Sequence, residues 1–118
     1  MDPRLSQALE QADLRSVKLK HLAQLKLKLH QDLTYAINGG IFDITQELIG
    51  FIFALDESIH TMIRSGTVLD RNARPILIED LADFKKRIVL KYRNASENYR
   101  HEHDRISKAE NIEELLGD

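Results

Sequence analysis

The chain has 118 residues, which is enough for one domain with a modest core. Charged residues make up 31% and hydrophobic residues 42% of it, a balance typical of solvated helices that bury a narrow apolar face. The absence of cysteine excludes disulfides and thiolate chemistry, and the net charge of −2 argues against a dedicated polyanion-binding protein. We expect a single domain over residues 1–118.

A long first helix is predicted from Asp2-Pro3 to about Leu33. Asp is a good N-cap, Pro suits the first turn, and no Gly or Pro interrupts the residues that follow. Alternating leucines and lysines in 25–29 are also compatible with a strand, but their helix-forming flanks favour a helix. The apolar residues of this helix recur at helical spacing: Leu5, Leu9, Ala12, Leu22, Leu25, Leu29 and Leu33.

Two β-hairpins are predicted on either side of a second helix. Asn38-Gly39 lies between β-branched and aromatic residues and suits a type I′ turn, although a plain loop between helices would also account for it. The second hairpin is expected to join strands 67–70 and 75–78 through the turn Arg71–Arg74, with Pro75 at a strand start. Two such hairpins could pair into one small antiparallel sheet covered by the second helix.

The second helix is expected from Thr45 to Arg64, and it is apolar around so much of its circumference that it should be the most buried element. A last helix is expected from Glu79 or Asp80 to near Ala109, with an apolar stripe of Leu81, Phe84, Ile88, Tyr92, Ala95, Tyr99, His103 and Ile106. The predicted fold class is mainly α (α+β). It consists of two long antiparallel helices plus a central buried helix, with one or two short β-hairpins forming a small head.

Charge and apolar surface together predict an interaction protein. Five cations and no acid lie between residues 15 and 28: Arg15, Lys18, Lys20, Lys26 and Lys28. Such a distribution can steer self-association, or it can be an ordinary solvated surface. Because two long helices bury only one stripe each, Tyr92 and Tyr99 need more cover than the opposite helix supplies. We expect a homo-oligomer.

Residues 110–118 are predicted to be an acidic tail, either flexible or helical. Ile112, Leu115 and Leu116 lie at i, i+3 and i+4, the spacing of a short docking helix. A frayed end that folds back on its own domain fits the same residues equally well.

The residues that carry chemistry form no complete site in the sequence. Glu97, His101, His103 and Asp104 are the densest set of metal-ligand types, but His101 and His103 diverge on a helix and no facing element supplies further ligands. No serine lies in a nucleophile elbow, and Gly39-Gly40 lacks the lysine of a phosphate loop. We expect no catalytic, cofactor-binding or metal-binding residue and a non-enzymatic protein.

Three segments, 5–15, 39–49 and 92–108, resemble small head-assembly proteins of T4-like tailed phages, especially those of marine cyanobacteria. The resemblance contains no catalytic signature. It implies a structural or assembly protein of prohead-core or scaffold type that oligomerises and contacts capsid or core proteins, in the host cytoplasm or the virion. The alternative is a regulatory module that engages a host protein or nucleic acid through its basic helices. We expect neither nucleic acid nor a membrane as the main partner, because the net charge is negative and the apolar run 48–55 is far shorter than the roughly 20 residues of a membrane span.

Overall fold

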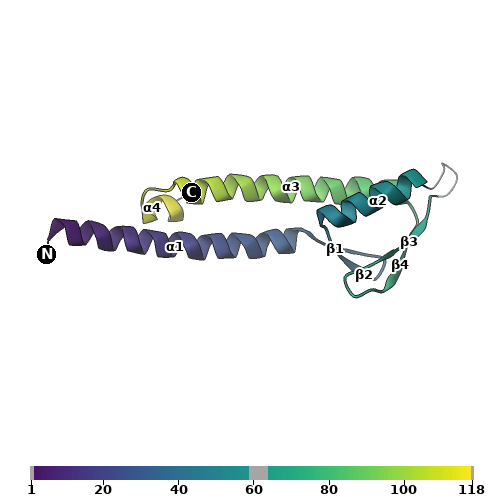
Figure 1. Cartoon of the computed structure of the whole chain (residues 1–118), viewed down its shortest axis with the longest axis horizontal. Helices are drawn as coiled ribbons and strands as arrows, with labels where there is room; N and C mark the ends of the chain where they lie inside the picture. Colours follow the sequence, from purple (N-terminus) through teal and green to yellow (C-terminus); the bar gives the residue numbers. More distant parts are fainter. Residues whose placement is uncertain (1, 59–63, 118) are drawn as a thin grey trace. The chain divides into compact units, whose positions relative to one another are not determined.

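The computed structural model describes residues 2–58 and 64–117. The protein is mainly helical with two short antiparallel hairpins, as the sequence predicts (Figure 1). In chain order the elements are α1 (Pro3–Asp32), β1 (Thr34–Ile37), β2 (Gly40–Asp43), α2 (Gln46–Ser58), β3 (Gly66–Leu69), β4 (Pro75–Ile78), α3 (Leu81–Lys108) and α4 (Ile112–Leu116).

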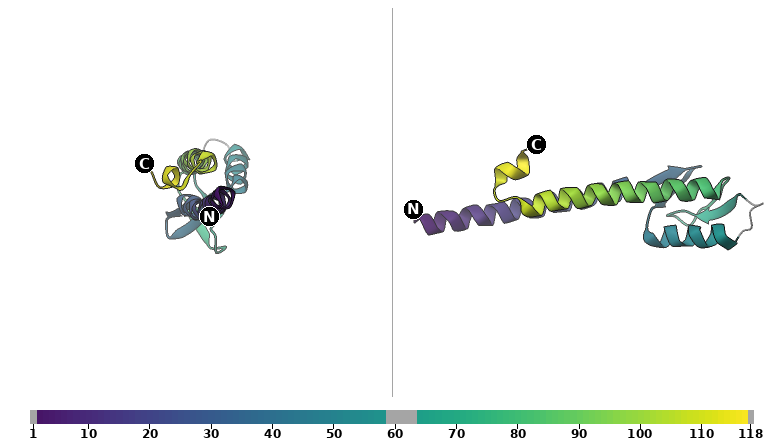
Figure 2. Two further views of the ribbon diagram at one scale, coloured as in Figure 1. Left: turned by 90° about the vertical axis from the view of Figure 1, so that its left-hand side faces the viewer. Right: turned by 90° about the horizontal axis from the view of Figure 1, so that it is seen from above.

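The chain forms two compact units. The helical unit consists of Met1–Leu29 and Glu97–Asp118, and the hairpin unit consists of His30–Ser96. The boundary between them falls inside both α1 and α3. Within the helical unit, α1 and the last turns of α3 run side by side in opposite directions (Figures 1 and 2). The antiparallel arrangement expected for the two long helices is present there.

The hairpins have the predicted turns. Asn38 and Gly39 have φ values of 51° and 81°, so both central residues have the positive φ that a type I′ turn requires. This turn joins β1 to β2 in the register Thr34↔Asp43. The plain helix–helix loop is thereby excluded. β3 pairs with β4, and Pro75 lies at the start of its strand opposite Leu69.

The two hairpins do not pair into one sheet, since β1–β2 and β3–β4 are separate two-stranded sheets. The turn of the second hairpin makes the connection instead. Arg71 donates its backbone N–H to the Ile41 carbonyl at 2.8 Å, and the Ile41 N–H donates to the Asp70 carboxylate at 3.0 Å. A carboxylate therefore accepts the bond that a neighbouring strand's carbonyl would otherwise receive.

The core of the hairpin unit forms where both hairpins and α2 meet the first turns of α3. Phe42 and Phe84 pack edge to face with their ring centroids 5.3 Å apart. Asp80 caps α3 by accepting the Asp83 N–H at 3.0 Å. The buried side chains of this core are Phe42, Ile44, Ile52, Val68, Ile76, Ile78, Leu81, Phe84 and Ile88.

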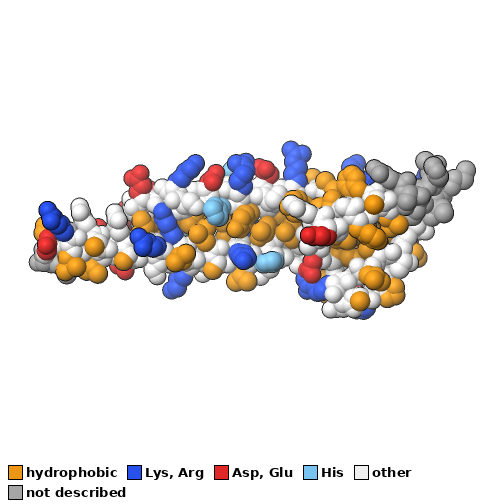
Figure 3. Space-filling model, viewed as in Figure 1, with side chains coloured by type: hydrophobic (Ala, Val, Ile, Leu, Met, Phe, Trp, Pro, Cys, Tyr) orange, Lys and Arg blue, Asp and Glu red, His pale blue; other side chains and the backbone are white. Residues whose placement is uncertain are grey.

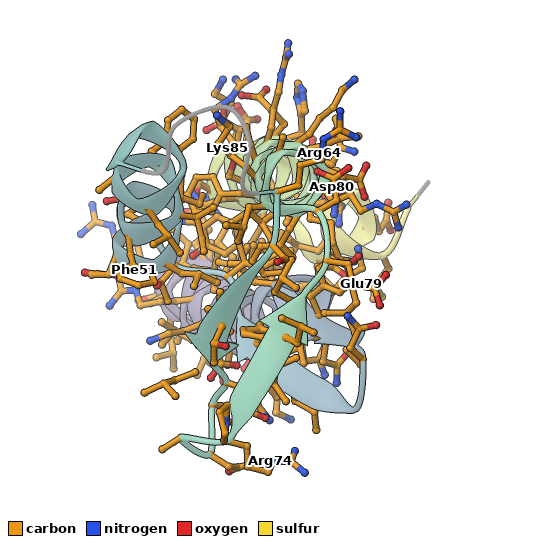
Figure 4. All side chains as sticks on the ribbon, turned by 90° about the vertical axis from the view of Figure 1, so that its right-hand side faces the viewer. Phe51, Arg64, Arg74, Glu79, Asp80 and Lys85 are labelled. Atoms are coloured by element: carbon orange, nitrogen blue, oxygen red, sulfur yellow. The ribbon has the colours of Figure 1, made fainter. Side chains whose placement is uncertain are left out.

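Helix α2 is not the most buried element, so that expectation is wrong. Ile52 is fully buried, whereas Phe51 is 52% exposed and lies on the outer side of α2 in Figure 4. The reason is that α2 packs through one face, while α3 places Leu81, Phe84 and Ile88 at the centre of the core. Residues 59–63, into which the predicted helix extended, lie outside the described residues.

Candidate interaction surface

The inner face of α1 in the helical unit is covered by α3 and α4. A small core contains Leu25 of α1, Ile106 of α3, Leu115 of α4 and Ala109 from the link between α3 and α4. The side chains packed around it are Leu14, Val17, Leu22 and Tyr99. Lys18 donates its Nζ to the Ser107 carbonyl at 3.0 Å across the same contact. This face of α1 is therefore covered by other helices of the same chain.

A second apolar stripe runs along the opposite side of α1. At about 100° per residue, its members fall within a band roughly 100° wide, on the other side of the helix from Leu14 and Leu25. Its four leucines are 49–63% exposed. Figure 3 shows hydrophobic side chains recurring along the lower edge of α1, interspersed with basic ones. We call this the outer stripe: Leu5, Ala8, Leu9, Ala12, Ser16, Leu19, Ala23 and Leu27.

The first third of α1 has almost no cover. Every residue from Pro3 to Asp13 except Ser6 is exposed. Asp2 caps the segment, since its side chain accepts the Arg4 N–H at 2.9 Å. An isolated helix of this length is marginal in water, because most helical stability in proteins comes from packing of an apolar face. The segment is therefore helical, although its apolar side is exposed to solvent.

This division differs from the single apolar series predicted for α1. Leu5, Leu9 and Ala12 belong to the outer stripe, whereas Leu22 and Leu25 face α3 and α4. A signal was present in the spacing. The step of ten residues from Ala12 to Leu22 rotates the helix by about 80° from the first group, so the series changes face there.

The five predicted interaction cations do not form one face. Arg15, Lys20, Lys26 and Lys28 are exposed on α1, while Lys18 is half-buried against α3. At helical spacing they are distributed around most of the circumference. Lys20 and Lys28 therefore lie on other sides of α1 than Arg15, Lys18 and Lys26.

The two predicted interaction tyrosines serve different units. Tyr92 is half-buried against the hairpin core, and its hydroxyl accepts a hydrogen bond from Gln46 Nε2 at 2.9 Å. Tyr99 packs against the helical core, with its ring centroid 5.7 Å from that of His103. Both side chains are thus used largely for packing within the chain.

The three predicted interaction residues of the tail lie in α4 and differ in how far each is buried. Leu115 is 3% exposed in the helical core, Ile112 is half-buried and Leu116 is 70% exposed. Asn111 caps α4 by accepting the Glu114 N–H at 2.8 Å, and Arg105 donates to the Leu115 carbonyl at 3.3 Å. The fold-back alternative accounts for this geometry, and it leaves Leu116 as the open member of the three.

Of the candidate metal-ligand residues on α3, Glu97, His101 and Asp104 are exposed, while His103 is half-buried beside Tyr99. Glu97 pairs with Arg100 at 2.8 Å, and His101 Nε2 lies 4.0 Å from the same carboxylate. His103 contacts the Ser107 hydroxyl at 3.4 Å. Among residues 2–58 and 64–117, no three His, Cys, Asp or Glu side chains are grouped closely enough to hold a metal ion.

In the hairpin unit the most concentrated polar contacts surround Asp70. Its carboxylate is fully buried and accepts the backbone N–H groups of Ile41, Asn72 and Arg74 at 2.9–3.0 Å. The Arg74 guanidinium, at the turn in Figure 4, lies 3.1 Å away. Burial alone would raise the pKa of Asp70, but these backbone hydrogen bonds and the Arg74 charge lower it to about 2. Asp70 thus joins the two hairpins by polar contacts.

We expect Asp70→Asn to be less stable than the wild type at neutral pH, with a difference that shrinks as pH falls from about 4 to about 2. The pKa of Asp70 is lower in the folded than in the unfolded chain, so its contribution is present above the unfolded value and disappears on protonation. Thermal melts of both proteins between pH 2 and 7 measure this. A difference in melting temperature that stays constant across that range would contradict the role given to the carboxylate.

Comparison with protein-family models, curated proteins and solved structures found no match. Within the described part of the chain, no helix combines the length and apolar character that a membrane crossing requires. The outer stripe therefore has to be interpreted from its own residues.

Proposed function

We propose that this protein is a non-enzymatic structural or assembly protein of a tailed phage, of prohead-core or scaffold type. It acts by self-association and by contacts with other capsid or core proteins. The resemblance of segments 5–15, 39–49 and 92–108 to phage head-assembly proteins supports the setting. The outer stripe of α1 supports the mode of action.

The outer stripe carries the proposal. It places four large exposed leucines on one side of a single helix, in a protein whose inner core is already complete on the other side. Aligned apolar side chains of this kind mark protein–protein contact surfaces, whereas isolated exposed leucines are ordinary. A helix that is packed on one face and apolar on the other suits an assembly component, which must fold alone and then associate.

The cations of α1 support this proposal over the alternative, a regulatory module that binds a host protein or nucleic acid. Their distribution around the helix favours solvated flanks beside an apolar seam over a phosphate-binding face. Retention of the protein on duplex or single-stranded DNA at low salt, lost at high salt, would favour the regulatory module.

Light scattering coupled to size exclusion tests the proposed function. We expect a discrete oligomer whose population rises with protein concentration and which persists at high salt with somewhat weaker association. A monomer at every concentration and both salt levels would contradict the proposal.

A further inference from the structure

We propose that the outer stripe pairs with the outer stripe of a second copy of this chain, with the two α1 helices antiparallel. This inference rests on the proposed function and specifies its contact. The occupant is argued from the spacing of the stripe and from the charges beside it.

The spacing of the stripe is that of a two-helix seam. Leu5, Leu9, Ala12, Ser16, Leu19 and Ala23 follow each other in alternate steps of four and three. This is the heptad spacing by which two helices pack knobs into holes. Ala12, Ser16 and Ala23 are small, so two helices can approach closely between the leucines. After Ala23 the next step of three falls on Lys26, and Leu27 lies beside the seam at that turn.

The charges beside the seam select an antiparallel partner. In a parallel pair, Arg15 lies beside Lys20 of the second copy, and Lys26 faces its own counterpart. The basic stretch 15–28 would then run alongside itself. In an antiparallel pair, Asp13 of each copy lies beside Lys20 of the other. The two-fold axis produces this attractive pair twice.

Cysteine cross-linking tests whether the two α1 helices are antiparallel. The chain has no cysteine of its own, so only the introduced thiols can react. We would make Ser6→Cys and Leu27→Cys separately and treat each protein, and a mixture of the two, with a short bismaleimide. The antiparallel pair places position 6 beside position 27 of the second copy, while two copies of position 6 are roughly 32 Å apart along the helices at 1.5 Å per residue.

The cross-linking pattern has three informative outcomes. Dimers formed in the mixture and not in either variant alone are the expected result. Dimers formed by each variant alone would mean a parallel pair and would overturn the inference. No cross-linking, in a protein that light scattering shows to be oligomeric, would also overturn the inference and leave the proposed function standing.

Substitutions in the stripe supply an independent test. The double variant Leu9→Lys with Leu19→Lys should be monomeric at concentrations where the wild type associates, and it should keep its helical content because both leucines are exposed. Leu116→Lys is the matched control, since Leu116 is exposed in the same unit but lies off the stripe. Unchanged association in the double variant would overturn the inference.

A charge swap tests the register. Asp13→Lys places two lysines together at both symmetric positions and should weaken self-association roughly five- to tenfold. Combining it with Lys20→Asp restores opposite charges and should recover most of the affinity. Equal weakening by the single and the double variant would contradict the pairing of Asp13 with Lys20.

Discussion

Phe84→Ala should destabilise the hairpin unit by about 3–5 kcal/mol, the usual cost of truncating a buried phenylalanine. Phe84 is 1% exposed and contacts the rings of Phe42 and Tyr35, with centroids 5.3 and 6.2 Å away. It lies in α3, where that helix meets β2, so its loss opens a cavity in the core of the hairpin unit. Urea denaturation followed by tyrosine fluorescence measures the change.

Phe51→Ala is the control for this prediction. It removes the same side chain from α2, but Phe51 is more than half exposed. Its effect on the free energy of unfolding should stay within about 1 kcal/mol. Similar losses for the two variants would mean that the core does not have the arrangement described above.

Leu25→Ala and Leu27→Ala should separate folding from association on one helix. Leu25 is 8% exposed in the core of the helical unit, so its truncation should cost about 2–3 kcal/mol at any protein concentration. Leu27 is 63% exposed and belongs to the outer stripe. In dilute protein, its truncation should change the free energy of unfolding by no more than about 0.5 kcal/mol. In concentrated protein, where the wild type associates, the truncation should lower stability.

Thermal melts at low and high concentration, monitored by circular dichroism, distinguish the two effects. The melting temperature of Leu25→Ala should fall by a similar amount at both concentrations. That of Leu27→Ala should fall only at the higher one. A concentration-independent loss in Leu27→Ala would mean that this side chain stabilises the folded chain itself.

Local signals in the sequence predicted most of the elements. Asp2-Pro3 and Asp80 mark where α1 and α3 begin, because each aspartate accepts backbone N–H groups of the first turn. Asn38-Gly39 predicted the first hairpin, since its turn needs two residues with positive φ. The apolar stripe of α3 was also predicted in full, and each of its members is buried or half-buried.

Contacts between distant elements could not be predicted from the sequence. Asp70 joins the two hairpins, which form separate sheets, through a hydrogen bond to Ile41, 29 residues away, and no local pattern indicates such a bond. An apolar circumference made α2 look central, but periodicity does not say which face finds a neighbour. For the same reason the outer stripe was merged with the inner face of α1. Only the position of α3 and α4 shows which leucines are covered.

Sedimentation velocity of the wild type and of the Leu9→Lys, Leu19→Lys double variant, over a wide range of protein concentration, tests the central claim most directly. We expect the wild-type sedimentation coefficient to rise with concentration to that of a dimer, while the folded double variant sediments as a monomer throughout. A wild type that never associates, or a double variant that associates equally well, would contradict the claim that the outer stripe is the contact surface.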